Sequence, residues 1–208
     1  MVKMGWMASW VAVQGAAKAD VLGHLELMEG DDEVVPGTRS AQFSCREFPD
    51  QWLMIFCEKL DWADQQRVLE LSRFGLALAC QFEDKVEMTS SLTAARDGVE
   101  LWRVFHDNTG SKFRLDVTGA PPPALAGIRE AAFEEQRQDG GEDSSTDFVH
   151  DVALDLGKAI CGYRADDDAA PFKALRKVGS STQRSDRGPV GLFAKLLAPL
   201  RPKPYPER

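Results

Sequence analysis

Hydrophobic and polar residues alternate along the middle of the chain, in residues 76–118. The alternation is clearest near the end of this segment, where Phe113, Leu115 and Val117 are separated by charged residues. A period of two is typical of a strand with one buried face. The triplets RDG and NTG separate such runs, and both suit tight hairpin turns. The segment therefore predicts a four-stranded antiparallel meander.

The remaining pattern places further strands and helices on both sides of the meander. Apolar runs predict strands at 5–13, 40–46 and 51–57, and helical periodicity predicts helices at 16–28, 61–74, 121–138 and 147–161. Polar composition predicts loops at 29–37, 139–146 and 165–170, and the spacing of Phe172 and Leu175 suggests a short last helix. Because strands and helices are partly segregated, we expect an α+β fold with a mainly antiparallel sheet and helices packed on it.

Charge divides the chain into an acidic body and a basic tail. The 208 residues carry a formal net charge of -8, while residues 179–208 contain six Lys or Arg and two Asp or Glu, so residues 1–178 carry -12. We expect residues 1–178 to form a single domain, and residues 179–208 to be a mostly flexible tail rich in Pro and Ser. An acidic body disfavours nucleic acid, which is bound through positive charge, and suits a basic protein partner.

The spacing of the cysteines and the N-terminal residues indicate the cellular compartment of the protein. The cysteines form no CxxC pair, and we expect reduced core thiols at Cys45, Cys57, Cys80 and Cys161. No segment has the length of apolar sequence that a membrane span needs. The first 19 residues loosely resemble a secretory signal, but the apolar run is poor in Leu and precedes an amphipathic helix, so we favour a first strand. These features predict a cytoplasmic protein without a cofactor.

Two His-Asp dipeptides are the candidates for catalytic or metal chemistry. They are His106-Asp107 in the meander and His150-Asp151 near a predicted helix start. A hydrolytic metal needs several converging ligands and an open position, and the sequence offers one further histidine. We therefore predict no metal site and no catalytic residue. The alternative is a small hydrolase using His106 with Asp107 and Glu87, which requires these three side chains to converge in a pocket.

Carboxylates recur every four residues along the last long predicted helix. Like charges at this spacing destabilise a helix. One interpretation is the solvated face of an acidic protein, and the other is a surface that attracts a basic partner. Acidic residues in the following loop would extend the same surface. The predicted partner-binding residues are Asp147, Asp151, Asp155, Asp166, Asp167 and Asp168.

Four stretches carry a resemblance to other proteins. They are GWMASWVAVQG near the start, EMTSSLTAARDGVELWRVFHD in the meander, GAPPP after it, and DFVHDVALDLGKAICGYRAD before the tail. Through these stretches the chain resembles a group of small acidic bacterial proteins with no assigned activity, and the resemblance covers most of residues 4–168 and excludes the tail. In size, acidity and lack of catalytic motifs, the chain is also similar to bacterial immunity proteins. This resemblance implies a non-enzymatic protein that binds and neutralises a cognate basic toxin.

The tail supports a third hypothesis, a structural or assembly protein. Residues 190–200 (VGLFAKLLAPL) are a short apolar segment within the basic tail. Such a segment can form a helix that packs on another copy of the chain. The pattern predicts no particular oligomeric state.

Overall fold

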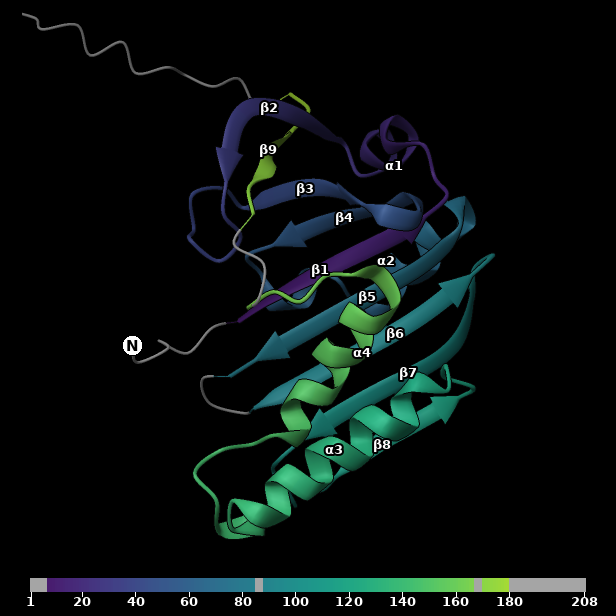
Figure 1. The fold of residues 1–208 in the computed structure, drawn as a ribbon. Coiled ribbons are helices and arrows are strands. Elements are labelled where there is room, and N and C mark those ends of the chain that lie inside the picture. Colours follow the sequence, from purple (N-terminus) through teal and green to yellow (C-terminus); the bar gives the residue numbers. More distant parts are fainter. Residues whose placement is uncertain (1–6, 85–87, 167–169, 180–208) are drawn as a thin grey trace, which may run out of the picture. The chain divides into compact units, whose positions relative to one another are not determined.

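The computed structural model describes residues 7–84, 88–166 and 170–179, which fold around a nine-stranded antiparallel sheet (Figure 1). The strands are β1 (Met7–Gln14), β2 (Leu27–Val34), β3 (Phe43–Phe48), β4 (Trp52–Cys57), β5 (Leu76–Glu83), β6 (Thr89–Arg96), β7 (Val99–Asp107), β8 (Leu115–Gly119) and β9 (Phe172–Lys177). Their order is β2-β9-β3-β4-β1-β5-β6-β7-β8. The expected α+β fold with a mainly antiparallel sheet is confirmed, and the sheet dominates it.

Helices cover both faces of this sheet. They are α1 (Lys18–His24), α2 (Gln65–Leu71), α3 (Ala124–Gln138) and α4 (Val152–Cys161). Apolar residues of α3 and α4 pack on one face, and those of α1 and α2 pack on the other. Short 3-10 turns are η1 (Pro49–Gln51), η2 (Leu60–Trp62), η3 (Ser72–Phe74), η4 (Gly141–Asp143) and η5 (Val149–Asp151). The described elements belong to the unit Met1–Val178, and Gly179–Arg208 is a separate unit.

The predicted meander is confirmed as β5, β6, β7 and β8, which are neighbours in chain order. Between β6 and β7, Asp97 and Gly98 both have positive φ angles, of 52° and 79°. Two positive φ angles in succession are the requirement of the tight turn that matches the twist of a hairpin. The RDG triplet therefore makes the predicted turn.

The first strand is also confirmed, and it lies in the middle of the sheet between β4 and β5. Ala8 to Val13 are buried on both faces. Trp10 packs in the core beneath α3 and α4, while Val11 packs in the core beneath α1 and α2. Burial on both sides explains why this stretch is apolar throughout instead of alternating.

Two predicted elements are wrong, and both belong to one side of the sheet. The expected loop at 29–37 is largely strand β2, and the expected last helix is strand β9, which pairs with β2. Phe172 and Leu175 lie in the cores on opposite faces of the sheet, as residues three apart do in a strand and not in a helix. Strand β2 could not be recognised from its pattern because it is an edge strand, and most of its side chains are exposed and polar.

Helix boundaries differ from the predictions for local reasons. Helix α2 begins later than expected because Asp64, and not Asp61, caps it, its Oδ1 accepting a hydrogen bond of 2.8 Å from the backbone N–H of Arg67. Helix α1 ends at His24, well before residue 28. Helix α4 ends at Cys161 as predicted, and Gly162 follows with a φ of 79°.

Candidate functional site

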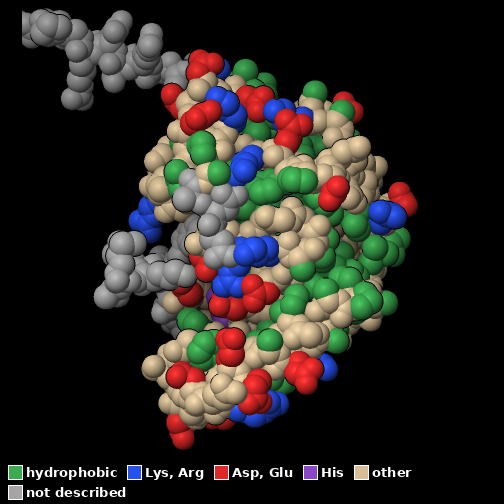
Figure 2. All heavy atoms as spheres, viewed as in Figure 1, with side chains coloured by type: hydrophobic (Ala, Val, Ile, Leu, Met, Phe, Trp, Pro, Cys, Tyr) green, Lys and Arg blue, Asp and Glu red, His purple; other side chains and the backbone are tan. Residues whose placement is uncertain are grey.

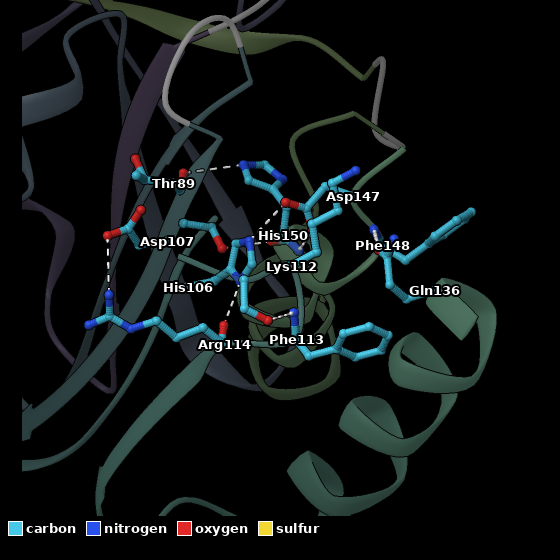
Figure 3. A network of polar contacts seen from close by, with 12 residues as sticks. Thr89, His106, Asp107, Lys112, Phe113, Arg114, Gln136, Asp147, Phe148 and His150 are labelled. Atoms are coloured by element: carbon cyan, nitrogen blue, oxygen red, sulfur yellow. Dashed lines mark hydrogen bonds and ion pairs between the residues drawn. The ribbon is translucent and has the colours of Figure 1, made fainter. Parts of the chain in front are cut away.

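His106 lies at the end of β7 with its side chain fully buried. Strand alternation places it on the α3 and α4 side of the sheet, together with Trp102 and Val104. Its Nδ1 lies 2.7 Å from the backbone oxygen of Arg114, and its Nε2 lies 2.9 Å from Oδ2 of Asp147 (Figure 3). Both ring nitrogens therefore have partners inside the protein.

Both partners of His106 are hydrogen-bond acceptors. One is a backbone oxygen and the other is the carboxylate of Asp147. Burial alone would raise the pKa of Asp147, but the hydrogen bond and charge of His106, together with the backbone N–H of His150, lower it below 3.8. The arrangement is therefore a buried histidine–carboxylate pair.

His150 lies next to this pair and has a different set of partners. Its Nε2 faces the backbone oxygens of Glu83, at 3.1 Å, and Thr89, at 3.2 Å. Its backbone N–H donates to Oδ1 of Asp147 at 3.1 Å, and its backbone oxygen accepts from Ser90 Oγ at 2.6 Å. His150 therefore connects the residues that precede α4 to the end of β5 and the start of β6.

Gln136, near the end of α3, extends the network into the connection between α3 and α4. Its side chain is fully buried, and its Nε2 donates to the backbone oxygens of Gly141 at 2.7 Å and Thr146 at 3.1 Å. Its Oε1 accepts from the backbone N–H of Phe148 at 2.9 Å. A single buried amide therefore satisfies three backbone groups of this connection.

A second set of contacts joins the same connection to the loop between β7 and β8. Glu142 accepts from Ser111 Oγ at 2.5 Å and from the backbone N–H of Lys112 at 2.9 Å. The ammonium group of Lys112 donates to the backbone oxygen of Ser144. The predicted polar loop at 139–146 is therefore bonded at several points to the loop between β7 and β8.

The geometry required for the hydrolase alternative is not present among the described residues. The carboxylate of Asp107 accepts from the backbone N–H of Thr109 at 2.9 Å and from its hydroxyl at 3.0 Å, and it lies 3.5 Å from Nη1 of Arg114. Glu87 lies outside the described residues. His106 has no free ring nitrogen with which to accept a proton from a nucleophile. The contact of His106 with Asp147 joins β7 to the connection between α3 and α4.

Metal binding finds no support in the same part of the chain. Within residues 7–84, 88–166 and 170–179, no group of three or more His, Cys, Asp or Glu side chains could hold a metal ion. All four cysteines are buried and free. Only a small area of histidine side chain is visible on the face shown in Figure 2.

The predicted acidic helix face is wrong in one respect. Asp147 precedes the helix, and its carboxylate is turned inward with a side-chain exposure of 3%. Because this carboxylate pairs with His106 and receives the N–H of His150, it cannot be part of an exposed binding surface. Asp167 and Asp168 lie outside the described residues.

The other predicted carboxylates converge on Arg164. Its Nη2 lies 2.9 Å from Asp151, its Nε lies 2.7 Å from Asp166, and its Nη1 contacts Asp155. The side chains of Asp151 and Asp155 are 44% and 43% exposed, whereas that of Arg164 is 11% exposed. We call these four residues the Arg164 cluster. In it, three carboxylates share one guanidinium.

Charges within the Arg164 cluster are mutually stabilised. Burial alone would lower the pKa of Arg164, but its hydrogen bonds and ion pairs with Asp166, Asp151 and Asp155 raise it. Burial alone would raise the pKa of Asp151, but His150 and Arg164 lower it. The ion pairs therefore favour the charged forms of Arg164 and Asp151. Arg164 could not be identified from the sequence, because it lies outside the predicted helix and belongs to no local motif.

Comparison with known proteins gives no family for this chain: no protein-family model, curated protein or solved structure matches it. None of the helices in the described part of the chain is long and apolar enough to cross a membrane.

Proposed function

We propose that this chain is a non-enzymatic cytoplasmic bacterial protein that binds a protein with a basic surface, and that it acts as an immunity protein neutralising a basic toxin. The observation that carries the proposal is the Arg164 cluster. Three carboxylates gather there around one guanidinium, and two of them are more than two-fifths exposed. An exposed excess of negative charge attracts a basic surface and accelerates the association.

The way Arg164 holds the carboxylates favours binding over simple solvation. Its guanidinium contacts all three, so Asp151, Asp155 and Asp166 are ordered before a partner arrives. Ordering in advance lowers the entropic cost of forming an interface. A Lys or Arg of the partner would meet oxygen atoms that Arg164 leaves unoccupied, because one guanidinium has five N–H donors for six carboxylate oxygens.

The His106–Asp147 pair is consistent with a binding protein. The hydrogen bonds of His106 and Asp147 hold the connection between α3 and α4 against β7. That connection leads directly into η5 and α4, which carry Asp151 and Asp155. The buried network therefore supports the element that presents the exposed carboxylates.

The test compares two double variants that remove equal charge. D151N/D155N changes the Arg164 cluster, and E134Q/E135Q changes two exposed carboxylates of α3. Each variant would be used to capture proteins from the source bacterium, and association rates with the captured protein would be measured. We expect a basic partner whose association with D151N/D155N is slower by roughly tenfold at low salt, with a smaller difference at high salt. The E134Q/E135Q variant should associate like the wild type.

Two results would contradict the proposal. If both double variants associate at the wild-type rate, the Arg164 cluster is not the binding surface. The immunity function has its own test, in which the captured partner is expressed in a bacterial host with and without this chain. We expect the partner alone to arrest growth and co-expression to restore it. A partner that does not harm the cell would rule out the immunity function.

A further inference from the structure

Strand β8 is one of the two edges of the sheet. It pairs with β7 on one side, and no described strand pairs with its other side. In the view of Figure 1, α3 crosses β7 and β8, and Leu115 of β8 packs against the core that contains Leu125 and Ala132 of α3. Val117 is opposite Val104 of β7 and points to the same side, yet it remains 38% exposed. An edge of this kind is a template for pairing with another strand.

The two edges of the sheet differ in charge. Strand β2 carries Glu29, Asp31, Asp32 and Glu33, which are all exposed. If two β2 strands paired antiparallel in their centred register, each Glu29 would lie opposite an Asp32. Like charges directly opposite each other destabilise a strand pair. Strand β2 is therefore protected against pairing with itself, and β8, with Asp116 as its single charged residue, is not.

We propose that β8 pairs antiparallel with β8 of a second copy of this chain, with the two-fold axis at Val117. In this centred register Leu115 lies opposite Gly119 of the second copy, and Asp116 lies opposite Thr118. The two Val117 residues lie opposite each other. The two sheets join into one continuous sheet, and each contact occurs twice because the pairing is symmetric.

Both faces of this pairing are chemically matched. On the α3 side, the two Val117 side chains cover each other's exposed surface. On the opposite side, the Asp116 carboxylate lies next to the Thr118 hydroxyl of the second copy. Arg114 of the same chain contacts Oδ2 of Asp116 at 2.8 Å, and Oδ1 can accept a hydrogen bond from that hydroxyl. The register keeps the two Asp116 carboxylates away from each other. These two matches, Asp116 with Thr118 and Val117 with Val117, favour a second copy of the chain as the partner of β8.

The short strand sets the strength of the interaction. Strand β8 has five residues, whereas a stable dimer buries about 1,200–2,000 Å² in total. We expect a weak, reversible dimer with a dissociation constant of about 1–100 µM.

The test uses the full chain and two substitutions at Thr118, which is exposed. T118K places a positive charge opposite Asp116 of the second copy, and T118D places a negative charge there. We expect T118K to tighten the dimer and T118D to weaken it, each by roughly threefold to tenfold, because the contact occurs twice. Sedimentation equilibrium over a range of concentrations measures the dissociation constants.

The effect on the monomer has the opposite sign, which separates dimerisation from stability. Within one chain Thr118 is opposite Arg103 of β7, so T118D is attracted to Arg103 and T118K is repelled. If the substitutions acted only through the stability of the folded monomer, T118D and not T118K would therefore give the tighter dimer. Control variants M28K and M28D make the same charge changes on β2, where Met28 is 41% exposed, and they should leave the dissociation constant unchanged.

Three outcomes would overturn the inference. The first is a chain that remains monomeric up to roughly 1 mM. The second is a dimer that responds equally to T118K and T118D, which would place the interface elsewhere, for example at the tail segment 190–200. The third is a dimer that responds to the changes at Met28.

Discussion

Asp147 and His106 are 41 residues apart in the sequence, and their side chains meet at 2.9 Å in the interior of the protein. Breaking a buried pair by removing one partner costs about 3–5 kcal/mol, because the other charge is left without compensation. We expect D147A to lower the free energy of unfolding by about this amount, measured by urea denaturation.

The matched control for this change is D143A. Asp143 is an exposed carboxylate of the same connection between α3 and α4. Exposed substitutions of this kind change stability by less than about 0.5 kcal/mol. Equal stabilities of D147A and D143A would show that the buried pair contributes nothing to the fold.

The pH dependence of stability follows from the same carboxylate. The pKa of Asp147 is lowered from 3.8 in the folded protein, so its ionised form stabilises the fold at pH values above about 3.8. This contribution is lost as the pH falls through the lowered pKa. We expect the difference in unfolding free energy between wild type and D147N to be largest near neutral pH and to shrink below pH 3.8. A difference that stays constant down to the lowest pH would contradict the lowered pKa.

Gly157 of α4 packs against Trp10 of the central strand. A Cβ atom at this position would lie 2.9 Å from Cζ2 of Trp10, whose side chain is 1% exposed. Overpacking a core costs about 1–3 kcal/mol, which exceeds the gain of roughly 0.5–1 kcal/mol from replacing a helical Gly by Ala. We therefore expect G157A to lower the melting temperature.

Gly127 provides the comparison for Gly157. It lies on the exposed side of α3, and no atom lies within 4 Å of a Cβ built there. G127A should raise stability by about 0.5–1 kcal/mol through helix propensity alone. If G157A were stabilising to the same degree, α4 would not pack closely on Trp10.

The cysteines should be unreactive in the native protein. Burial raises the pKa of Cys45 to about 12 and those of Cys57 and Cys161 to about 11, and it also raises the pKa of Cys80. Because the thiolate is the reactive form, we expect no alkylation at pH 8 without denaturant, and four alkylated thiols in urea, as counted by mass spectrometry. Rapid alkylation of the folded chain would contradict the burial of these residues.

Local patterns predicted the elements that have one clearly buried face. The meander at 76–118 followed from alternation and from the RDG turn, and the central strand followed from its continuous apolar run. The same reasoning failed for β2 and β9. In β2 most side chains are exposed, and in β9 Phe172 and Leu175 face opposite cores. The spacing of two apolar residues does not reveal such an arrangement, because the arrangement depends on which other strands lie beside the segment.

The candidate site depended still more on the tertiary structure. The sequence identified both His-Asp dipeptides and the acidic residues that follow them, since these are matters of residue type and local spacing. It could not show that Asp147 turns inward to His106, or that Asp151 and Asp155 share Arg164. Periodicity reports which side of an element a residue occupies, whereas ion pairs depend on distances between segments that are far apart in the chain. The sequence thus determined most of the elements and the number and sign of the charges. The packing of α3 and α4 on the sheet decided which charges are buried and which remain exposed.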